Sequence, residues 1–465
     1  MKDYQPFWFK DALQREGDLH TITLSTDISM DLCIVGGGYT GLWSAIKIKE
    51  VCPELDITLI EAGLCGSGAS GRNGGCMLTF STKYPSMTKL FGTAEAKRLV
   101  SASEEAVFEM AEYCKQHNID CDIRIDGTFY TATNPAQQGS MESTIQQLSV
   151  AGVNRWKQIP TADVQTLAGS KLHLEGHFSG AAGSLQPALL ARGLRKRAID
   201  LGIQIFENTP MQQLIEGQPA KVITPQGTIT ANKVVLATNA WMARQFKEFR
   251  RTIVLVSSDM AITQPIPDAL NATGLTSGAA VVDSNTFVHY YRSTPDGRLM
   301  LGKGGNLFAF ANKMLKAFDE ESRFKPILYR AFRRFFPDIS TDKIETTWTG
   351  ASDRSVTGLP FFGFFRGHKN IVYGLGYSGN GVVQTYLGSE VIRSLILERQ
   401  DEWSQSGLAK GPRGRFPIEP FRWTGAMLVR GAIRRKEAAE DNHQPPFWID
   451  KQLAKLAAAA GKADK

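Results

Sequence analysis

Residues 31–63 read DLCIVGGGYTGLWSAIKIKEVCPELDITLIEAG, and this stretch decides the fold. It predicts a buried strand over 31–35, a helix over 42–51 that Pro53 ends, and a second strand over 56–60. A strand, a helix and a second strand in this order form one βαβ unit of about thirty residues. The sequence therefore predicts an α/β fold.

The turn between the first strand and the helix carries the pattern G-x-G-x-x-G at Gly36, Gly38 and Gly41. The first glycine permits a tight turn, the second lets a pyrophosphate approach the main chain, and the third lets helix and strand pack closely. Phosphates then lie at the helix N-terminus, whose free N–H groups favour negative charge. Glu61 ends the second strand about twenty residues later, where a carboxylate accepts hydrogen bonds from ribose hydroxyls. Together these features predict a Rossmann-type dinucleotide-binding domain.

A second glycine-rich segment, GSGASGRNGG, follows at 66–75. Its small residues would let a flat ring or a pyrophosphate lie against the main chain, whereas a nicotinamide enzyme would continue into further βα units. GGGYTGL, Glu61 and GASGRNGG together resemble the D-amino-acid-oxidase-like (DAO) superfamily of FAD-dependent amine oxidoreductases. GASGRNGG and the long C-terminus bring the chain closest to the γ-glutamylputrescine oxidoreductases of that superfamily. The resemblance implies that the cofactor is FAD.

Three later segments fit the same resemblance, which covers roughly residues 28–400. SLQP at 184–187 opens a helix and is followed by a strand, after which Met211 would lie on the adenine side of FAD. KVVLATNAW at 233–241 matches an ATGAW-like motif of the family, with Asn239 in place of the glycine. NIVYGLGYSGNGV at 370–382 is a strand, a glycine loop and the start of a helix, and in the family this loop contacts the pyrimidine edge of the flavin.

The implied fold class is α/β (α+β), with two domains and an extension. The Rossmann-type FAD-binding domain is discontinuous and comprises residues 28–84, 176–245 and 346–400. Residues 85–175 and 246–345 form a substrate domain with a mixed or antiparallel β-sheet, because 252–263, 279–292 and 297–302 carry β-branched and alternating patterns. Residues 401–465 form a C-terminal extension.

The resemblance also assigns residues to FAD and implies that FAD is bound without a covalent bond. Some relatives attach flavin through a histidine or a cysteine near the ring. Here no histidine lies between His20 and His117, no cysteine follows Cys121, and Cys76 is the one thiol next to the glycine-rich segment. The predicted FAD-binding residues are Gly36, Gly38, Gly41, Glu61, Ser70, Arg72, Asn73, Gly74, Gly75, Met211, Thr238, Trp241, Gly376, Ser378, Gly379, Asn380, Gly381 and Val382.

The candidate substrate residues are Tyr290, Tyr291, Arg292, Lys303 and Trp348. Side chains alternate along a strand, so Tyr291 points opposite to Tyr290 and Arg292, and only one set can face the flavin. Arg292 and Lys303 would hold an anionic end of a substrate. In some relatives a lysine near the flavin promotes oxygen reduction. The structural alternatives are tyrosines that pack the sheet and basic residues in exposed ion pairs.

The resemblance implies oxidation of a small primary or secondary amine, which is γ-glutamylputrescine-like, polyamine-like or amino-acid-like. Hydride passes to flavin N5, the imine hydrolyses to an aldehyde, and O2 reoxidises the flavin to give H2O2. An aminophosphonate substrate, a hydroxy acid substrate and an amine dehydrogenase with another electron acceptor remain open. A flavin-bearing binding or RNA-modifying protein is a further alternative. The spacing of His173 and His177 is ligand-like, but Gly176 interrupts any helix, so we expect a surface turn and no metal.

Composition sets the remaining expectations. A chain of 465 residues with 42% hydrophobic and 21% charged residues is typical of a globular enzyme. The net charge of +7 invites a nucleic-acid partner, but the basic clusters at 192–197, 244–251 and 430–436 lie in no base-reading motif, so we expect solvated helix faces and no nucleic acid. Six cysteines without a C-x-x-C pair indicate reduced thiols and a cytoplasmic location.

The two ends of the chain carry separate expectations. The N-terminal residues lack the apolar core of a signal peptide, and no apolar run approaches the length of a membrane span. Residues 421–440 mix apolar and basic side chains, which fits either a membrane-surface helix or, more ordinarily, a helix docked on the body. The last residues, 453–465, are expected to fray. The sequence leaves the oligomeric state open.

Overall fold

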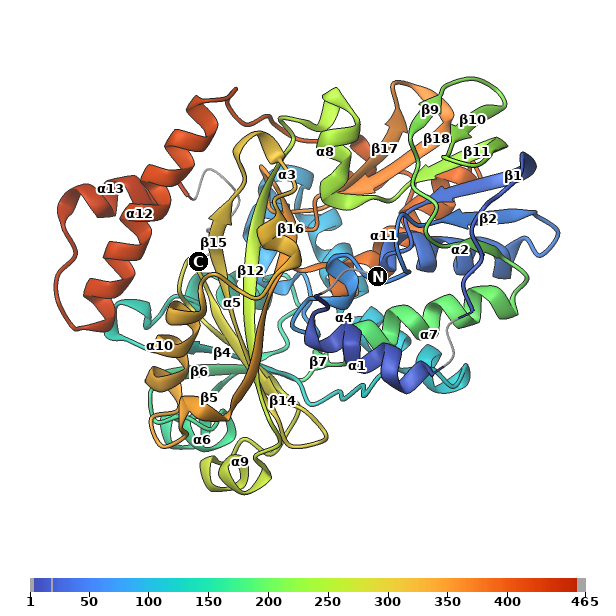
Figure 1. The fold of residues 1–465 in the computed structure, drawn as a ribbon. Helices are drawn as coiled ribbons and strands as arrows, with labels where there is room; N and C mark the ends of the chain where they lie inside the picture. The colour runs from blue at the N-terminus through green and yellow to red at the C-terminus, as the bar shows by residue number, and fades with distance from the viewer. Residues whose placement is uncertain (1–3, 18–19, 458–465) are drawn as a thin grey trace.

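The computed structural model describes residues 4–17 and 20–457. Two eight-stranded sheets make up most of the body, and helices cover them (Figure 1). A short pair of strands, β3 (Cys76–Met77) and β7 (Gly183–Ser184), lies apart from both sheets. The predicted fold class, a Rossmann-type domain with a second mixed sheet, is confirmed.

The first sheet contains the predicted βαβ unit. Its central strands run parallel and are buried, as expected when helices or loops cover both faces. The strands lie in the order β17 (Phe361–Phe365), β18 (His368–Leu375), β11 (Thr228–Leu236), β1 (Ile28–Val35), β2 (Ile57–Ile60) and β8 (Gln204–Phe206). Two further strands, β10 (Ala220–Ile223) and β9 (Gln213–Ile215), extend it antiparallel from β11.

Helices from four parts of the chain pack together beside this sheet. Helix α2 (Tyr39–Val51) contacts α7 (Pro187–Asp200) and α11 (Gly381–Ile396), and α11 contacts α4 (Thr93–Gln116). Helix α1 (Phe7–Glu16) lies against α7 (Figure 1). Trp43 and Leu42 of α2 are completely buried in the core that these helices share with the sheet. The N-terminus of α2 is thereby fixed at the end of β1.

The second sheet is mixed, as the strand patterns predict, because β13 pairs parallel with β4 and the other neighbours pair antiparallel. Helices α6 (Thr161–Leu167), α9 (Pro267–Thr273) and α10 (Lys325–Phe335) pack on it. The strand order is β16 (Ile344–Ser355), β12 (Ile253–Thr263), β15 (Leu299–Phe308), β14 (His289–Ser293), β13 (Ala280–Asp283), β4 (Thr128–Ala132), β6 (Glu175–Ser179) and β5 (Trp156–Ile159).

Strand pairing bears on two of the expected domain boundaries. Residues 176 and 346 lie inside β6 and β16, and both strands belong to the second sheet. Sequence periodicity identifies a strand but not the sheet it joins, since pairing is decided by distant partners. We propose a division after Ser179 and after Ser355 instead.

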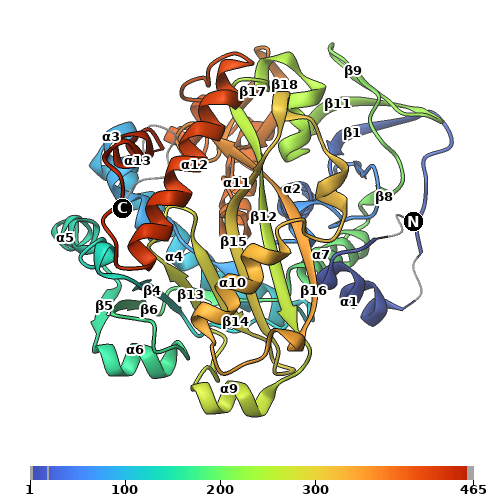
Figure 2. The same cartoon turned by 60° about the vertical axis from the view of Figure 1, so that its left-hand side comes forward.

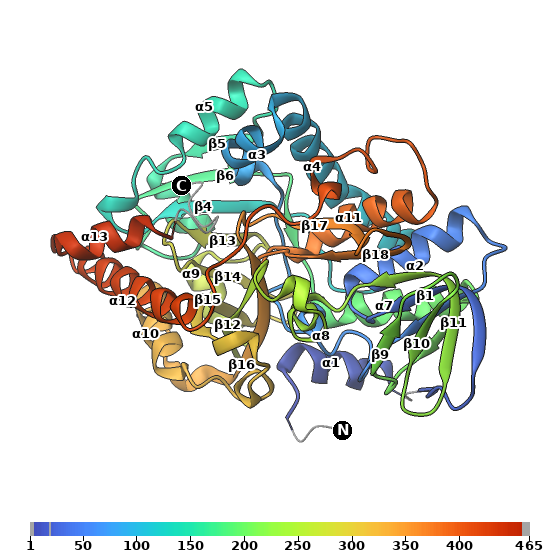
Figure 3. The same ribbon diagram turned by 90° about the horizontal axis from the view of Figure 1, so that it is seen from above.

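The C-terminal extension docks on the body. Helices α12 (Phe421–Asp441) and α13 (Trp448–Lys455) form a hairpin, and α12 runs along β15 (Figure 2). None of the helices within the described residues is long and apolar enough to cross a membrane. Of the residues expected to fray, 458–465 lie outside the described part of the chain. Three short helices, α3 (Tyr84–Phe91), α5 (Glu142–Val150) and α8 (Met242–Gln245), complete the fold (Figure 3).

Candidate cofactor and substrate site

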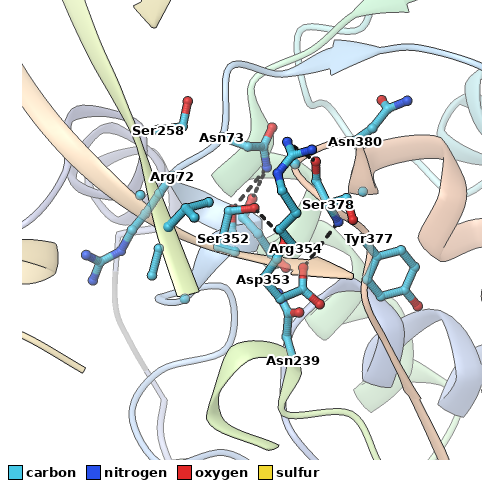
Figure 4. Close-up of a pocket in the computed structure, with 18 of the residues that line it drawn as sticks. Arg72, Asn73, Asn239, Ser258, Ser352, Asp353, Arg354, Tyr377, Ser378 and Asn380 are labelled. Atoms are coloured by element: carbon cyan, nitrogen blue, oxygen red, sulfur yellow. Dashed lines mark hydrogen bonds between the residues drawn. The ribbon is translucent and has the colours of Figure 1, made fainter. Parts of the chain in front are cut away.

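A cavity of about 1380 Å³ is lined by residues of both sheets. Pockets for one small molecule are usually about 300–1,000 Å³, so this cavity has room for a dinucleotide and a second small molecule. Its lining is mostly apolar, with polar groups among the apolar side chains. Figure 4 shows one such polar group of residues, which includes Asp353, Arg354 and Ser378.

The four segments that the sequence assigned to FAD converge on this cavity. Gly36, Gly38 and Glu61 line it from the βαβ unit. Residues 66–70 and 72–74 line it from the glycine-rich segment, 237–239 and Trp241 from the end of β11, and 377–382 from the loop before α11. Met211, which follows β8, lines the cavity as well. Segments far apart in the chain therefore meet at one site.

The glycines of the first turn fit a cofactor that needs close approach of the main chain. Gly36 has φ +115°, and a Cβ there would lie 2.6 Å from the Ala237 carbonyl oxygen. A Cβ on Gly41 would lie 1.9 Å from the carbonyl oxygen of Gly36, so only glycine permits this turn. Gly41 is not among the lining residues; it supports the turn from behind.

Glu61 is held at the cavity wall by main-chain donors. Its Oε2 accepts a hydrogen bond from the Gly37 N–H over 2.8 Å, and its Oε1 accepts one from the Gly63 N–H over 3.0 Å. Burial raises the pKa of the Glu61 carboxyl, while the N–H groups of Gly63 and Gly37 lower it. A fixed carboxylate at this place can accept hydrogen bonds from ligand hydroxyls.

Buried arginines support the loop that follows Glu61. Arg192 and Arg195 of α7 donate to the Glu207 carboxylate over 2.8 and 3.0 Å, and Glu207 accepts the Cys65 N–H over 2.7 Å. The basic cluster at 192–197 is therefore not a solvated helix face throughout, because two of its arginines are buried as partners of an acid. The composition of a helix alone does not reveal such partners.

Hydrogen bonds to α2 and within the segment hold the glycine-rich segment in place. Ser70 Oγ accepts the Tyr39 N–H over 2.9 Å, and Asn73 Oδ1 accepts the Gly75 N–H over 2.8 Å. A Cβ on Gly75 would lie 2.0 Å from the carbonyl oxygen of Leu185, the residue that follows β7, so Gly75 packs closely against the main chain there. Gly75 is not among the lining residues. Gly74 lines the cavity.

Arg72 connects this segment to the second domain. Its guanidinium donates to the Phe318 carbonyl oxygen over 2.5 Å and pairs with Asp319 over 2.9 Å. Figure 4 shows the side chain directed away from Asp353 and Arg354. Arg72 therefore lines the cavity while its charge is neutralised by the chain itself.

Asp353 and Arg354 on β16 are site residues that the sequence reasoning missed. Asp353 accepts hydrogen bonds from the N–H groups of Gly376 and Ser378, and Arg354 donates to the Ser378 carbonyl oxygen over 3.1 Å (Figure 4). Burial raises the pKa of Asp353 to about 6 and lowers that of Arg354 to about 10. Adjacent opposite charges inside a buried strand were the available signal. Gly376 is not a lining residue; it positions the loop through Asp353.

Two side chains leave buried acceptors that point to a bound molecule. Asn239 Oδ1 and Gln384 Oε1 are buried, have no hydrogen-bond partner among the described residues, and belong to lining residues. Buried acceptors normally have donors, so a ligand with hydrogen-bond donors fits here. Gln384 lies in the first turn of helix α11, which begins at Gly381 and whose N-cap, Asn380, makes no side-chain capping bond. These features fit a large polar cofactor such as a flavin dinucleotide.

Of the predicted substrate residues, Tyr290 lines the cavity and the other four do not. The hydroxyl of Tyr290 lies 2.8 Å from Ser258 Oγ, and Ser258 also lines the cavity. Tyr291 points to the opposite side of β14, as the alternation predicts. There its hydroxyl donates to the Ala168 carbonyl oxygen over 2.7 Å and meets His173 Nε2 at 2.6 Å.

Arg292, Lys303 and Trp348 are not among the residues that line the cavity, and their polar groups bond to the chain. Arg292 donates to the carbonyl oxygens of Gly74 and Leu185, each over 2.7 Å. The Lys303 ammonium donates to the Phe287 carbonyl oxygen over 2.9 Å and lies 2.9 Å from His289 Nε2. Trp348 Nε1 donates to the Arg72 carbonyl oxygen over 2.8 Å. All three residues are buried.

The expected surface turn around two histidines is also wrong. His173 and His177 are both buried, and His177 lies within β6. Within the described residues, no group of three or more potential ligands is placed to hold a metal ion.

Comparisons with known proteins agree with this site. Residues 31–395 match the DAO family, described as FAD dependent oxidoreductase. The γ-glutamylputrescine oxidoreductase of Escherichia coli (strain K12) is 31% identical over 410 residues, which cover 87% of this chain and 93% of that protein. The glycine oxidase of Bacillus subtilis (strain 168) is 22% identical over 384 residues, which cover 79% and 93%.

A solved structure supports the same assignment of the fold. The crystal structure of glycine oxidase from Geobacillus kaustophilus superimposes with a TM-score of 0.67 at 18% identity and covers 82% of this chain and 98% of that one. The family match spans most of the chain, and the cavity has the features that a flavin dinucleotide requires. The chain therefore belongs to the DAO family of FAD-dependent oxidoreductases.

Proposed function

We propose that this FAD-dependent oxidoreductase oxidises a small primary or secondary amine, with a γ-glutamylated diamine as the leading substrate. The observation that carries the proposal is the 31% identity to γ-glutamylputrescine oxidoreductase, which extends over 87% of this chain and 93% of that enzyme. The product is an imine that water hydrolyses to an aldehyde, and O2 is the proposed electron acceptor, giving H2O2. The six cysteines are free thiols, which fits the proposed cytoplasmic location.

The residues that would hold FAD are those that line the polar end of the cavity. The turn at 36–41 and the N-terminus of α2 would take the pyrophosphate, and Glu61 a ribose. The loop at 376–382, held by Asp353, would take the flavin edge together with the N-terminus of α11. When bound, the flavin accepts a hydride from the carbon that bears the amine.

The part of the cavity wall on β12 would favour the reactive form of an amine. Val256 and Met260 of β12 line the cavity and are buried. Apolar surroundings disfavour a charged ammonium, so an amine held against them is shifted toward its neutral form. Burial raises the pKa of Tyr290 well above its ordinary value, so its hydroxyl stays protonated and orients the amine together with Ser258.

The proposal is tested with purified, FAD-loaded protein mixed with candidate substrates in the absence of O2. γ-Glutamylputrescine, putrescine, N-methyl amino acids, hydroxy acids and aminophosphonates are each added, and the visible absorbance of the flavin is followed. We expect bleaching by one or more amines and H2O2 when O2 is admitted. Bleaching by hydroxy acids alone would overturn the proposal, and bleaching by amines without peroxide would replace O2 with another electron acceptor.

We also propose that FAD is bound without a covalent bond. Cys76 is the thiol of concern, since it lines the cavity, and burial raises its pKa to about 11, which disfavours the reactive thiolate. Acid precipitation should leave all of the flavin in the supernatant. Flavin retained on the washed protein pellet would contradict the proposal.

A further inference from the structure

Helix α12 forms a wall of the cavity that the family match does not include. The match ends at residue 395, whereas α12 spans Phe421–Asp441. Its lining residues between Phe421 and Ile433 recur at every third or fourth position. Residues at this spacing share one face of a helix, so one side of α12 is turned toward the cavity over several turns.

Polar contacts hold this helix in place beside the cavity. Trp423 Nε1 donates to the Phe308 carbonyl oxygen over 3.1 Å, and the Glu437 carboxylate accepts the Phe287 N–H over 2.9 Å. Phe308 and Phe287 themselves line the cavity, so the anchoring points border it. The wall is therefore a fixed part of the site.

Arg430 is a cation on this wall that lacks an anionic partner. Its Nη1 donates to the Asn306 carbonyl oxygen over 2.6 Å, and it forms no ion pair with a carboxylate in the part of the chain that the structure describes. Other arginines of α12 do have such partners, since Arg422 pairs with Glu419 over 2.6 Å and Arg435 with Asp450 over 2.7 Å. Arg430 is half-buried and lines the cavity.

A second arginine adds to the positive charge at this place. Arg434 lies one turn further along α12 and donates to Asn306 Oδ1 over 3.0 Å. Burial and the nearby Arg434 both lower the pKa of Arg430. A partly desolvated cation is stabilised when an anion binds to it, and the planar guanidinium matches a carboxylate with two parallel hydrogen bonds.

Apart from Arg422, which is paired with Glu419, the rest of the stripe is small or apolar. Gly425, Ala426 and Val429 line the cavity from the same face of α12. They offer surface for methylene groups but no hydrogen bonds from their side chains. The wall thus combines an apolar stretch with one unpaired cation.

We propose that α12 is the specificity wall of this enzyme and that Arg430 binds a carboxylate at the end of the substrate remote from the oxidised amine. The inference rests on the proposed function, because it presumes that the other end of the substrate is an amine oxidised in the same cavity. It narrows the substrate class to amines joined by a short chain to a carboxylate. Figures 1 and 3 show α12 beside the second sheet and α2 beside the first.

Two synthetic substrates that differ only in their acyl group test this inference. N-acetylputrescine and N-glutarylputrescine carry the same free amine, and only the second carries a remote carboxylate. We expect the Arg430→Gln enzyme to have a KM for N-glutarylputrescine at least about tenfold above wild type, because a charge-assisted bond is lost. Its kcat, and its KM for N-acetylputrescine, should stay within about twofold of wild type.

A control variant and a binding measurement complete the experiment. Lys436→Gln removes a charge from the same helix at a residue that is not among those lining the cavity, and it should leave both KM values unchanged. Glutarate, titrated into the FAD-loaded protein by calorimetry, should bind wild type more tightly than Arg430→Gln by a similar factor. Equal glutarate affinities, or equal increases in KM for both substrates, would overturn the inference.

The binding arm also separates this inference from the proposed function. If no amine bleaches the flavin, the proposed function fails, yet the glutarate titration still decides whether Arg430 binds a carboxylate. If Arg430→Gln does not load FAD, Arg430→Lys is used instead, because it keeps the positive charge but loses the two parallel N–H donors of the guanidinium. Its affinity for glutarate should be lower than that of wild type. An Arg430→Lys affinity equal to wild type would count against bidentate binding.

Discussion

Tyr290 and Tyr291 are neighbours on β14, but their hydroxyls have different surroundings. Removing the Tyr291 hydroxyl leaves the Ala168 carbonyl oxygen and His173 without their partner in the interior. Tyr291→Phe should therefore lower the free energy of unfolding by about 1–3 kcal/mol and leave kcat and KM unchanged. Urea unfolding and steady-state kinetics measure the two effects.

Tyr290→Phe, the same substitution at the neighbouring residue, should reduce activity and leave stability nearly unchanged. The Tyr290 hydroxyl bonds to Ser258 at the cavity wall, where water can replace it. Tyr290→Phe should lower kcat/KM for an amine by about three- to tenfold, as expected for one lost hydrogen bond, and change stability little. An unchanged kcat/KM would remove Tyr290 from the substrate site.

Gly41 offers a second test at the level of one residue. A methyl group there would meet the carbonyl oxygen of Gly36 at 1.9 Å, and a backbone atom cannot move aside cheaply. Gly41→Ala should cost about 1–3 kcal/mol or more in stability and lower the FAD content of the purified protein. Gly431→Ala in α12 is the control, since its new methyl would meet only the flexible end of Arg435 at 3.3 Å. Full FAD loading of Gly41→Ala would contradict the role of the turn.

Single residues were predictable from sequence where a local motif constrains them. Gly36, Gly38 and Glu61 are tied to a turn whose geometry is set within the segment itself. Asp353 was missed, because its partners at 376–378 are more than twenty residues away and no motif joins them. Lys303 was expected at the substrate site but is not among the lining residues. Alternation along a strand predicts the face on which a side chain lies, but not which other elements cover that face.

At the level of elements, the pairing of His173 with β14 makes stability depend on pH. The Tyr291 hydroxyl donates to Ala168, so His173 Nε2 must donate to Tyr291, and the ring is neutral. Burial lowers the pKa of His173 to about 4 from its ordinary value of 6.5. The unfolded chain therefore binds a proton more readily, and stability is lost as the pH falls through this window.

This loss should be measurable by urea unfolding. Between pH 7 and pH 5, His173 should contribute a fall of about 2 kcal/mol in the free energy of unfolding. His173→Gln keeps a hydrogen-bond donor for Tyr291 but has no group that titrates in this range. Between pH 7 and pH 5 the free energy of unfolding of this variant should therefore fall by about 2 kcal/mol less than that of wild type. Equal slopes for wild type and variant would show that His173 is already solvated in the folded state.

The elements themselves were largely predictable, and their assembly was less so. The βαβ unit and the helix over 381–396 follow from local patterns of glycine and apolar residues. The membership of β6 and β16 in the second sheet depends on pairing with distant strands, which the sequence pattern around residues 176 and 346 does not reveal. The pattern of residues 421–440 predicted a docked helix, but not that one face of it lines the cavity.

At the level of the whole molecule, the cavity joins the two sheets, so its occupant should stabilise both. Free FAD at about a hundredfold excess over Kd should raise the free energy of unfolding by about 2.7 kcal/mol. The urea midpoint should rise with FAD concentration, with tryptophan fluorescence and circular dichroism shifting together. Gly41→Ala should show a smaller shift. Two separate transitions, with FAD moving only one, would contradict a site shared by the two domains.

The proposed reaction is tested most directly by a single reduction of the bound flavin. FAD-loaded protein is mixed with one equivalent of γ-glutamylputrescine without O2, and flavin absorbance and aldehyde are both quantified. We predict complete bleaching and one aldehyde formed for each flavin reduced. An unbleached flavin with γ-glutamylputrescine and with every other amine tested, together with reduction by a hydroxy acid, would contradict amine oxidation as the function of this protein.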